Sequence, residues 1–312
     1  MSPEPHHPAM YDRKLVFTAA CLGMLVFGVV MTTLGTILPA VIERFDIDMA
    51  RAGTLVSLLS AGILAGSVVF GPVVDRYGYR GLLLLCTALV ALGLEGIAFA
   101  SSLALLQPAI FLIGFGGGVI NGGTNALVAD ISSEGRSAGL SLLGVFYGVG
   151  ALSIPLLLGL TLRQGVYTVP VAIVGACALL PLLFFIAIRF PQPKQAQGFP
   201  IKDGLKLIRE TTLLLLGLML FLESGMEITV GNWTTSFLTS ELGLDAADAA
   251  FFLSFFLLGM TLARLLLGGL LKKTSPARVL LACIGIGIAG ALIMIFSPNL
   301  PVAVCGLFLI GV

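Results

Sequence analysis

The chain is a series of long apolar stretches separated by short polar connections. Apolar stretches cover residues 15–42, 51–73, 80–100, 104–130, 138–161, 167–189, 211–239, 248–271 and 277–297. A bilayer core requires a helix of ~20 apolar residues, and lipid supplies no hydrogen-bond partners for an open backbone. We therefore predict nine membrane-spanning helices, and a tenth that begins near Leu300 and is cut off at Val312.

The composition supports a chain that lies largely within the bilayer. Hydrophobic residues make up 58% of the 312 positions and charged residues 11%, with a mean hydropathy of +1.08. Soluble domains carry about 25% charged residues. The net charge of +1 gives no basic field of the kind that binds nucleic acid. We predict a multi-pass integral membrane protein, in the inner membrane if it is bacterial, that acts as a monomer.

The distribution of histidine and cysteine argues against metal and enzyme chemistry. Both histidines, His6 and His7, lie in the polar amino-terminal tail. The five cysteines are scattered through apolar stretches without the short spacings of metal sites or disulfide frameworks. We expect no metal, no cofactor and no enzymatic activity.

The positions of lysine and arginine predict the orientation. If the amino terminus is cytoplasmic, thirteen of the 17 Lys and Arg residues fall on the cytoplasmic side and three on the other, with Arg264 inside a span. Cytoplasmic loops of membrane proteins carry an excess of these residues. We therefore predict a cytoplasmic amino terminus.

The two halves of the chain repeat each other at an offset of 197 residues, which superimposes Gly62 on Gly259 and Cys86 on Cys283. The same offset places residues 111–114 on the identical tetrapeptide 308–311. An offset of six spans is a parallel repeat. We predict a six-helix half at 1–189, a cytoplasmic linker at 190–210 and an incomplete second half at 211–312. A complete repeat would need about 390 residues.

The connection between the second and third spans contains a charged motif. Residues 71–80 read GPVVDRYGYR and match the pattern GxxxDRxGxR. Gly71 would allow two helices to approach closely, and Gly78 would allow a turn with positive φ. Asp75 could form charge pairs with Arg76 and Arg80 that hold one half against the other. The motif resembles the cytoplasmic loop of the major facilitator superfamily. The resemblance implies an all-α fold of two six-helix halves, with the second half truncated in span ten.

Two further segments narrow this resemblance. Residues 116–125 of the fourth span read GGGVINGGTN, and residues 227–233 of the seventh span read EITVGNW. Both segments are similar to the fucose permease-like sugar:proton symporters. The resemblance implies a sugar or related polyol as the substrate and protons as the coupling ion.

Four ionisable residues stand out inside predicted spans, where such a group is costly: Glu95, Glu223, Glu227 and Arg264. Glu95 lies near the outer end of its span, where it can reach the interface, and the other three indicate a coupling site. Glu223 and Glu227 are four residues apart and share one helix face. Two buried carboxylates this close do not both ionise readily, so at least one is expected to hold a proton. Arg264 lies at a depth similar to that of Glu223, and pairing these two would leave Glu227 as the exchangeable acid. The alternative is a static buried ion pair.

Neutral polar residues in the spans are candidates for a substrate cavity. Amides and hydroxyls both donate and accept hydrogen bonds, which suits a sugar, and a tryptophan can stack on its apolar face. The same residue types also join helices in membrane bundles, and a tryptophan can anchor a helix at the interface. Both interpretations stay open for this set. The candidates are Thr32, Thr36, Asn121, Asn125, Tyr147, Asn232 and Trp233.

The sequence thus favours secondary transport of a small, sugar-like solute coupled to protons by alternating access. A drug or metabolite efflux antiporter of the same fold is the second interpretation. It ranks lower because the fifth span carries Gly150 and Pro155 but no clean GxxxGPxxGG pattern. A non-transporting membrane sensor is a third alternative.

Overall fold

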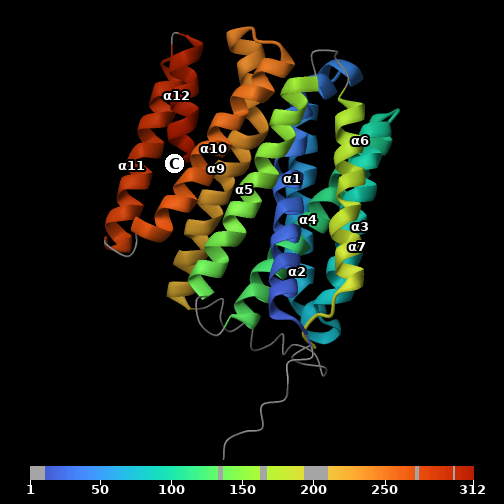
Figure 1. Ribbon diagram of the computed structural model, residues 1–312. Coiled ribbons are helices and arrows are strands. Elements are labelled where there is room, and N and C mark those ends of the chain that lie inside the picture. The colour runs from blue at the N-terminus through green and yellow to red at the C-terminus, as the bar shows by residue number, and fades with distance from the viewer. Residues whose placement is uncertain (1–10, 133–135, 162–166, 193–209, 271–273, 298) are drawn as a thin grey trace, which may run out of the picture.

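A computed structural model describes residues 11–132, 136–161, 167–192, 210–270, 274–297 and 299–312, and the regular structure of these ranges is entirely helical (Figure 1). The helices are α1 (Arg13–Phe45), α2 (Met49–Tyr77), α3 (Tyr79–Phe99), α4 (Leu103–Ile131), α5 (Arg136–Thr161), α6 (Thr168–Cys177), α7 (Leu179–Ala187), α9 (Thr211–Leu242), α10 (Ala246–Leu270), α11 (Pro276–Ile295) and α12 (Leu300–Gly311).

The predicted spans are confirmed. Within the described ranges, nine helical segments are long and apolar enough to cross a membrane, and the shorter α12 follows them. The sixth span differs from the prediction because it is divided into α6 and α7 at Ala178. Pro181 lacks the N–H that would bond the carbonyl four residues earlier, at Cys177, so the helical ladder is interrupted there. Together α6 and α7 still form one span, 168–187.

Several helix ends have local capping residues. The Asp12 carboxylate accepts a hydrogen bond from Lys14 N at 2.8 Å at the start of α1, and Asp48 accepts one from Arg51 N at 2.8 Å at the start of α2. Such caps satisfy backbone donors that have no partner within the helix. At the end of α9, Gly243 adopts φ 66°, the left-handed conformation typical of a helix C-cap. The turns between spans are therefore specified locally.

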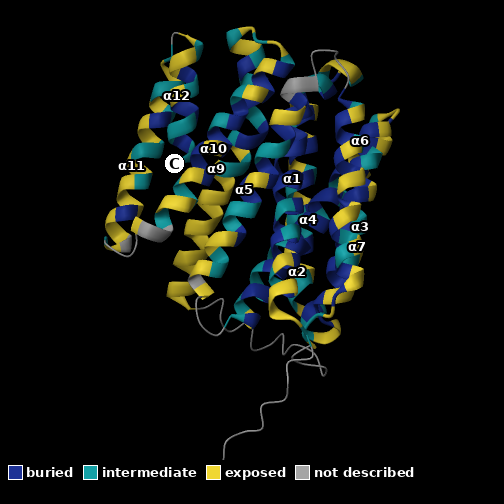
Figure 2. Cartoon of the chain, in the orientation of Figure 1, coloured by how far each residue is buried: buried dark blue, intermediate teal, exposed yellow. Residues whose placement is uncertain are grey.

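The helices pack side by side, with α1 buried near the centre (Figures 1 and 2). In the first half α1 packs on α5, and α4 packs on both α2 and α3. In the second half α12 packs on α10 and α11. The first part of α9, residues 211–226, is exposed along its whole length. The predicted linker at 190–210 lies almost wholly outside the described residues, and the half boundaries stay a prediction.

The two halves meet along α5–α10 and α1–α9. At the second contact, Gly35 of α1 lies against the backbone of α9. A Cβ added at Gly35 would lie 2.5 Å from Asn232 Cα and closer still to the Gly231 carbonyl oxygen. The Thr235 hydroxyl donates a hydrogen bond to the Gly35 carbonyl oxygen. This crossing, which we call the α1–α9 crossing, is therefore a contact between main chains.

The loop motif at 71–80 behaves partly as predicted. Gly78 has φ 78° and its N–H donates to the Val74 carbonyl oxygen at 2.8 Å, which confirms the turn with positive φ. Close helix approach at Gly71 is not found, because an added Cβ there would meet no described atom within 4 Å. Arg76 lies over the Tyr77 ring, 5.3 Å from its centroid. The predicted charge pairs of Asp75 stay a prediction.

Arg80 makes a contact within its own half. Its guanidinium donates to the Ile186 carbonyl oxygen at 2.8 Å, near the end of α7. The orphan carbonyls at a helix C-terminus attract cations. This arginine therefore joins the α2–α3 turn to the end of the sixth span.

Candidate functional site

A cavity of about 190 Å³ lies between the two halves, bordered by α1, α2, α4, α5, α9 and α10. We call it the central cavity. Its lining consists of Met24, Phe27, Met31, Ile63, Asn121, Tyr147, Glu223, Ser224, Glu227, Ile228 and Arg264. One part of this wall is apolar and comes mainly from α1. The other part is polar and charged and comes mainly from α5, α9 and α10.

Three of these residues, from three helices, contact one another. The Tyr147 hydroxyl of α5 donates a hydrogen bond to Glu227 Oε1 of α9. Arg264 Nη2 of α10 lies 3.9 Å from Glu227 Oε2. The Arg264 guanidinium also lies over the Tyr147 ring, 4.8 Å from its centroid, which is cation–π geometry. Glu227 thus has a hydrogen-bond donor from the first half and a counter-charge from the second.

Small residues on α5 make room for this arrangement. A Cβ added at Gly144 would lie 3.2 Å from Arg264 Cδ, and one added at Gly148 would overlap the Thr261 side chain. Arg264 Nη1 is also 3.4 Å from the Gly144 carbonyl oxygen. Small residues four apart let membrane helices approach closely. The spacing of Gly144 and Gly148 is therefore a sequence signal that could have predicted the α5–α10 contact.

The partner of Arg264 differs from the expected one. We expected Arg264 to pair with Glu223, and the structure places it on Glu227 instead. Glu223 is exposed and lines the same cavity, one turn away along α9, where it accepts a hydrogen bond from the Ser224 hydroxyl at 3.3 Å. The two carboxylates share one face, as predicted, but Glu227 is the one held by the two other side chains.

The two asparagines of α4 form a local pair. Asn125 Nδ2 donates to both the backbone oxygen of Asn121, at 2.9 Å, and its side-chain oxygen, at 3.0 Å. Asn121 lines the central cavity. Asn125 does not line this cavity, and its amide holds the Asn121 side chain in place.

The predicted threonines lie elsewhere. Thr32 is buried, and its hydroxyl bonds the Gly28 and Ala151 carbonyl oxygens at 3.2 and 3.1 Å. The Thr36 hydroxyl bonds the Thr32 carbonyl oxygen at 2.7 Å. Neither lines the central cavity. The Thr32 contact fits the alternative interpretation, in which a threonine joins two helices, here α1 to α5, whereas Thr36 bonds only within α1.

The last two candidates lie further along α9. Asn232 is buried at the α1–α9 crossing and donates to the Ile228 carbonyl oxygen at 2.8 Å. The Trp233 ring lies near Gly53 of α2. Neither lines the central cavity. Sequence reasoning missed the apolar wall formed by Met24, Phe27 and Met31, because an apolar residue in a span carries no signal that separates cavity from lipid.

Comparisons with known proteins agree with this architecture. The family model described as "Major Facilitator Superfamily" matches residues 20–312. An uncharacterized MFS-type transporter of Yersinia pestis is 24% identical over 321 aligned positions, which cover 100% of this chain and 80% of that protein.

Two solved structures share the fold. A mutant of the nucleoside transporter NupG superposes with a TM-score of 0.74 at 16% identity, covering 95% of this chain and 79% of that one. A bacterial homologue of the human lysosomal transporter Spinster, in an inward-facing and occupied conformation, superposes with a TM-score of 0.70 at 16% identity, covering 98% and 72%. The span count, the repeat, the loop motif and the family match lead to one conclusion: this multi-pass membrane protein belongs to the Major Facilitator Superfamily of transporters.

Proposed function

We propose that the protein carries a small polar solute of the sugar class across the membrane together with protons, by alternating access, and that Glu227 is the proton-binding group. One observation carries the proposal. A carboxylate of the second half, Glu227, is bonded by Tyr147 of the first half beside Arg264, in a cavity between the halves. Carboxylates in membrane spans that face the bundle interior mark ion and proton pathways.

The charge on Glu227 affects contacts between the halves. When Glu227 is ionised it attracts Arg264 and accepts the Tyr147 hydrogen bond. When it is protonated, Arg264 loses its counter-charge while it remains only 28% exposed. An unpaired charge in such surroundings is costly, so protonation favours a different arrangement of α5, α9 and α10. A proton taken up on one side can therefore shift the equilibrium between conformations.

The cavity wall fits a solute with a polar edge and an apolar face. Asn121, Ser224 and Glu223 offer amide, hydroxyl and carboxylate groups, and the Phe27 ring lies on the apolar part of the wall. A sugar ring presents hydroxyls at its edge and C–H groups on its faces, which suit such a surface. The present volume of about 190 Å³ is below the ~300–1,000 Å³ of ordinary ligand sites, so the proposed solute is small.

The test is solute uptake into vesicles that contain the full chain, with and without an imposed pH gradient, across a panel of radiolabelled monosaccharides. Glu227→Gln should abolish accumulation driven by the gradient, while exchange of labelled for unlabelled solute continues, because exchange requires no net proton movement. Glu223→Gln is the comparison variant: Glu223 lines the same cavity but forms no ion pair with Arg264 within the described residues, so its loss should weaken solute affinity yet keep accumulation driven by the gradient. Gradient-driven accumulation that is unchanged in Glu227→Gln would exclude this role.

An efflux antiporter is the second candidate, and the apolar wall favours it. Met24 and Met31 lie beside Phe27 in the cavity. Methionine side chains adapt to varied ligands and are common on binding surfaces of broad specificity. Under this alternative the same carboxylate would bind a proton and a solute alternately. Cells that express the protein would then resist amphiphilic compounds, and Glu227→Gln would remove the resistance.

A further inference from the structure

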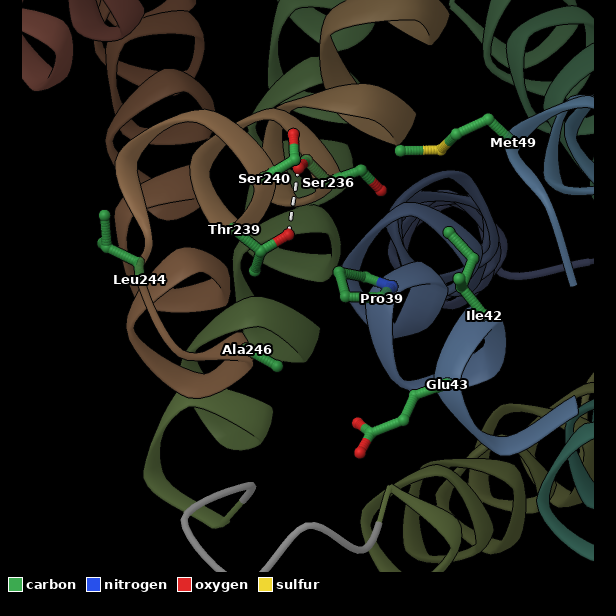
Figure 3. A pocket seen from close by; sticks show the side chains of 9 residues that line it. All are labelled: Pro39, Ile42, Glu43, Met49, Ser236, Thr239, Ser240, Leu244 and Ala246. Atoms are coloured by element: carbon green, nitrogen blue, oxygen red, sulfur yellow. Dashed lines mark hydrogen bonds between the residues drawn. The ribbon is translucent and has the colours of Figure 1, made fainter. Parts of the chain in front are cut away.

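A second and larger cavity lies at the end of the bundle opposite the start of α1. It has a volume of about 390 Å³ and lies where α1 and α9 end and α2 and α10 begin (Figure 3). We call it the far-end cavity. Its volume is within the ~300–1,000 Å³ of small-molecule sites. The α1–α9 crossing at Gly35 and Gly231 separates it from the central cavity.

Its polar wall is a row of hydroxyls on one face of α9. Ser236, Thr239 and Ser240 line the cavity, and their spacing of three and four residues places them on the same side of the helix. The Glu43 carboxylate of α1 lies across from them in Figure 3. Among the lining residues Glu43 is the one with an acidic side chain. The acidic side chain that lines this cavity disfavours anions close to it.

One of these hydroxyls has no partner. Ser236 is 3% exposed, and its Oγ makes no hydrogen bond with any residue that the structure describes. A buried hydroxyl without a partner is costly, and serines and threonines in helices ordinarily bond a carbonyl one turn back. Thr33 and Thr36 of α1 do so at 2.7 Å. In Figure 3 the Ser236 side chain instead points away from α9, into the space between α9 and α1.

Asn232, one turn along α9 toward the central cavity, repeats this feature. Its Oδ1 is buried and has no partner among the described residues. Glu227 and Ile228 line the central cavity one further turn away. The face of α9 that joins the two cavities thus carries two polar atoms one turn apart, Asn232 Oδ1 and Ser236 Oγ, that have no hydrogen-bond partner among the described residues.

We propose that the far-end cavity is a second binding site, for a neutral or cationic polyhydroxy compound of hexose size, and that Ser236 contacts the bound compound. The hydroxyls of α9 bond its hydroxyl groups, and the apolar side chains of Pro39, Ile42 and Met49 cover its C–H face. Glu43 stabilises a cationic substituent and repels an anionic one. The expected class of ligand follows from the proposed function, whereas the presence of a binding site here is argued from the cavity and Ser236 alone.

The test measures how fast a small thiol reagent modifies Ser236→Cys in the purified full chain in detergent, with the exposed native cysteines, Cys177 and Cys305, replaced by serine. The probes are glucose, glucosamine and gluconate, which share a carbon skeleton and differ in charge. At about twice its dissociation constant a bound probe slows modification ~3-fold. Glucose and glucosamine should slow modification in a saturable way, and gluconate should not. Glucosamine should protect at lower concentrations than glucose, because its ammonium group lies near Glu43. Glu43→Gln should abolish this difference while glucose still protects.

Ser101→Cys is the matched control, because Ser101 is exposed in the α3–α4 connection and does not line the cavity. Equal protection by all three probes, protection of the control thiol, or no protection by any probe overturns the proposal. The uptake experiment tests the proposed function independently. If the probes protect Ser236→Cys but uptake does not depend on Glu227, the far-end site stands and the proposed function is wrong. If uptake depends on Glu227 but no probe protects Ser236→Cys, only the far-end site is wrong.

Discussion

Substitution of Gly35 by alanine should prevent the two halves from closing at the α1–α9 crossing. The added Cβ would lie 2.5 Å from Asn232 Cα and closer to the Gly231 carbonyl oxygen, both of which are main-chain atoms. A flexible side chain could turn away from the new methyl group, but a helix backbone must move as a whole. The movement would also break the hydrogen bond from the Thr235 hydroxyl to the Gly35 carbonyl oxygen.

The magnitude follows from these two effects. Overpacking of one methyl group in a close contact costs ~1–3 kcal/mol. Loss of one hydrogen bond costs ~1 kcal/mol. The closed conformation should therefore lose ~2–4 kcal/mol relative to one in which α1 and α9 are apart. Since ~1.4 kcal/mol is a factor of ten, its population relative to the open conformation should fall ~30- to ~1,000-fold.

The assay is a distance measurement by electron spin resonance between labels at Glu43→Cys and Ser240→Cys, which lie on the α1 and α9 sides of the far-end cavity. The exposed native cysteines, Cys177 and Cys305, are replaced by serine to avoid additional labels. Gly35→Ala should move the distance distribution to longer values and abolish transport, while circular dichroism still reports a helical protein.

Gly231→Ala is the control, because it adds a methyl group at the same crossing where none of the described residues places an atom within 4 Å of the new Cβ. It should leave the distribution unchanged. If the label distances in Gly35→Ala match those of the parent protein, or if both alanine variants separate the halves equally, the reasoning from main-chain contact is wrong.

Two further predictions concern stability. Arg264→Ala leaves the Glu227 carboxylate, which is 15% exposed, without its counter-charge, and should lower the thermal stability. Adding Glu227→Gln should restore part of that loss. Equal losses in the single and double variants would show that the pair does not interact. Gly78→Ala places a side chain at φ 78°, which costs ~1–3 kcal/mol and should lower Tm by roughly 2–6 °C. Gly81→Ala, three residues away, adds a methyl group to open space and should not lower it.

The spans could be predicted from sequence because the bilayer restricts the chain so strongly. The predicted span 104–130 corresponds to α4, Leu103–Ile131, and 277–297 corresponds to α11, Pro276–Ile295. In a solvent without hydrogen-bond partners, an apolar segment of this length has no stable conformation except a helix. The break at Ala178 was missed because prolines also occur inside continuous helices of this chain, as at Pro39 and Pro155, so a proline alone does not mark a break.

The site could be predicted only in part, because sequence periodicity places residues on one helix but not between helices. The spacing of Glu223 and Glu227 correctly placed both on one face that lines the cavity. The choice between them as the partner of Arg264 depends on how closely α10 approaches α5. That approach is set by Gly144 and Gly148, on a helix that neither glutamate belongs to. Depth along neighbouring helices is a poor guide to such pairing.

The main-chain contact between α1 and α9 has a consequence for leakage. A barrier made of side chains fluctuates on the picosecond to nanosecond scale as rotamers change, and each fluctuation can admit water or a proton. A barrier made of two touching backbones has no rotamers, so it opens only when whole helices move, on the microsecond to millisecond scale. We therefore expect the Gly35–Gly231 contact to reduce ion leakage through the bundle and to make its opening slower than the movement of a side-chain barrier.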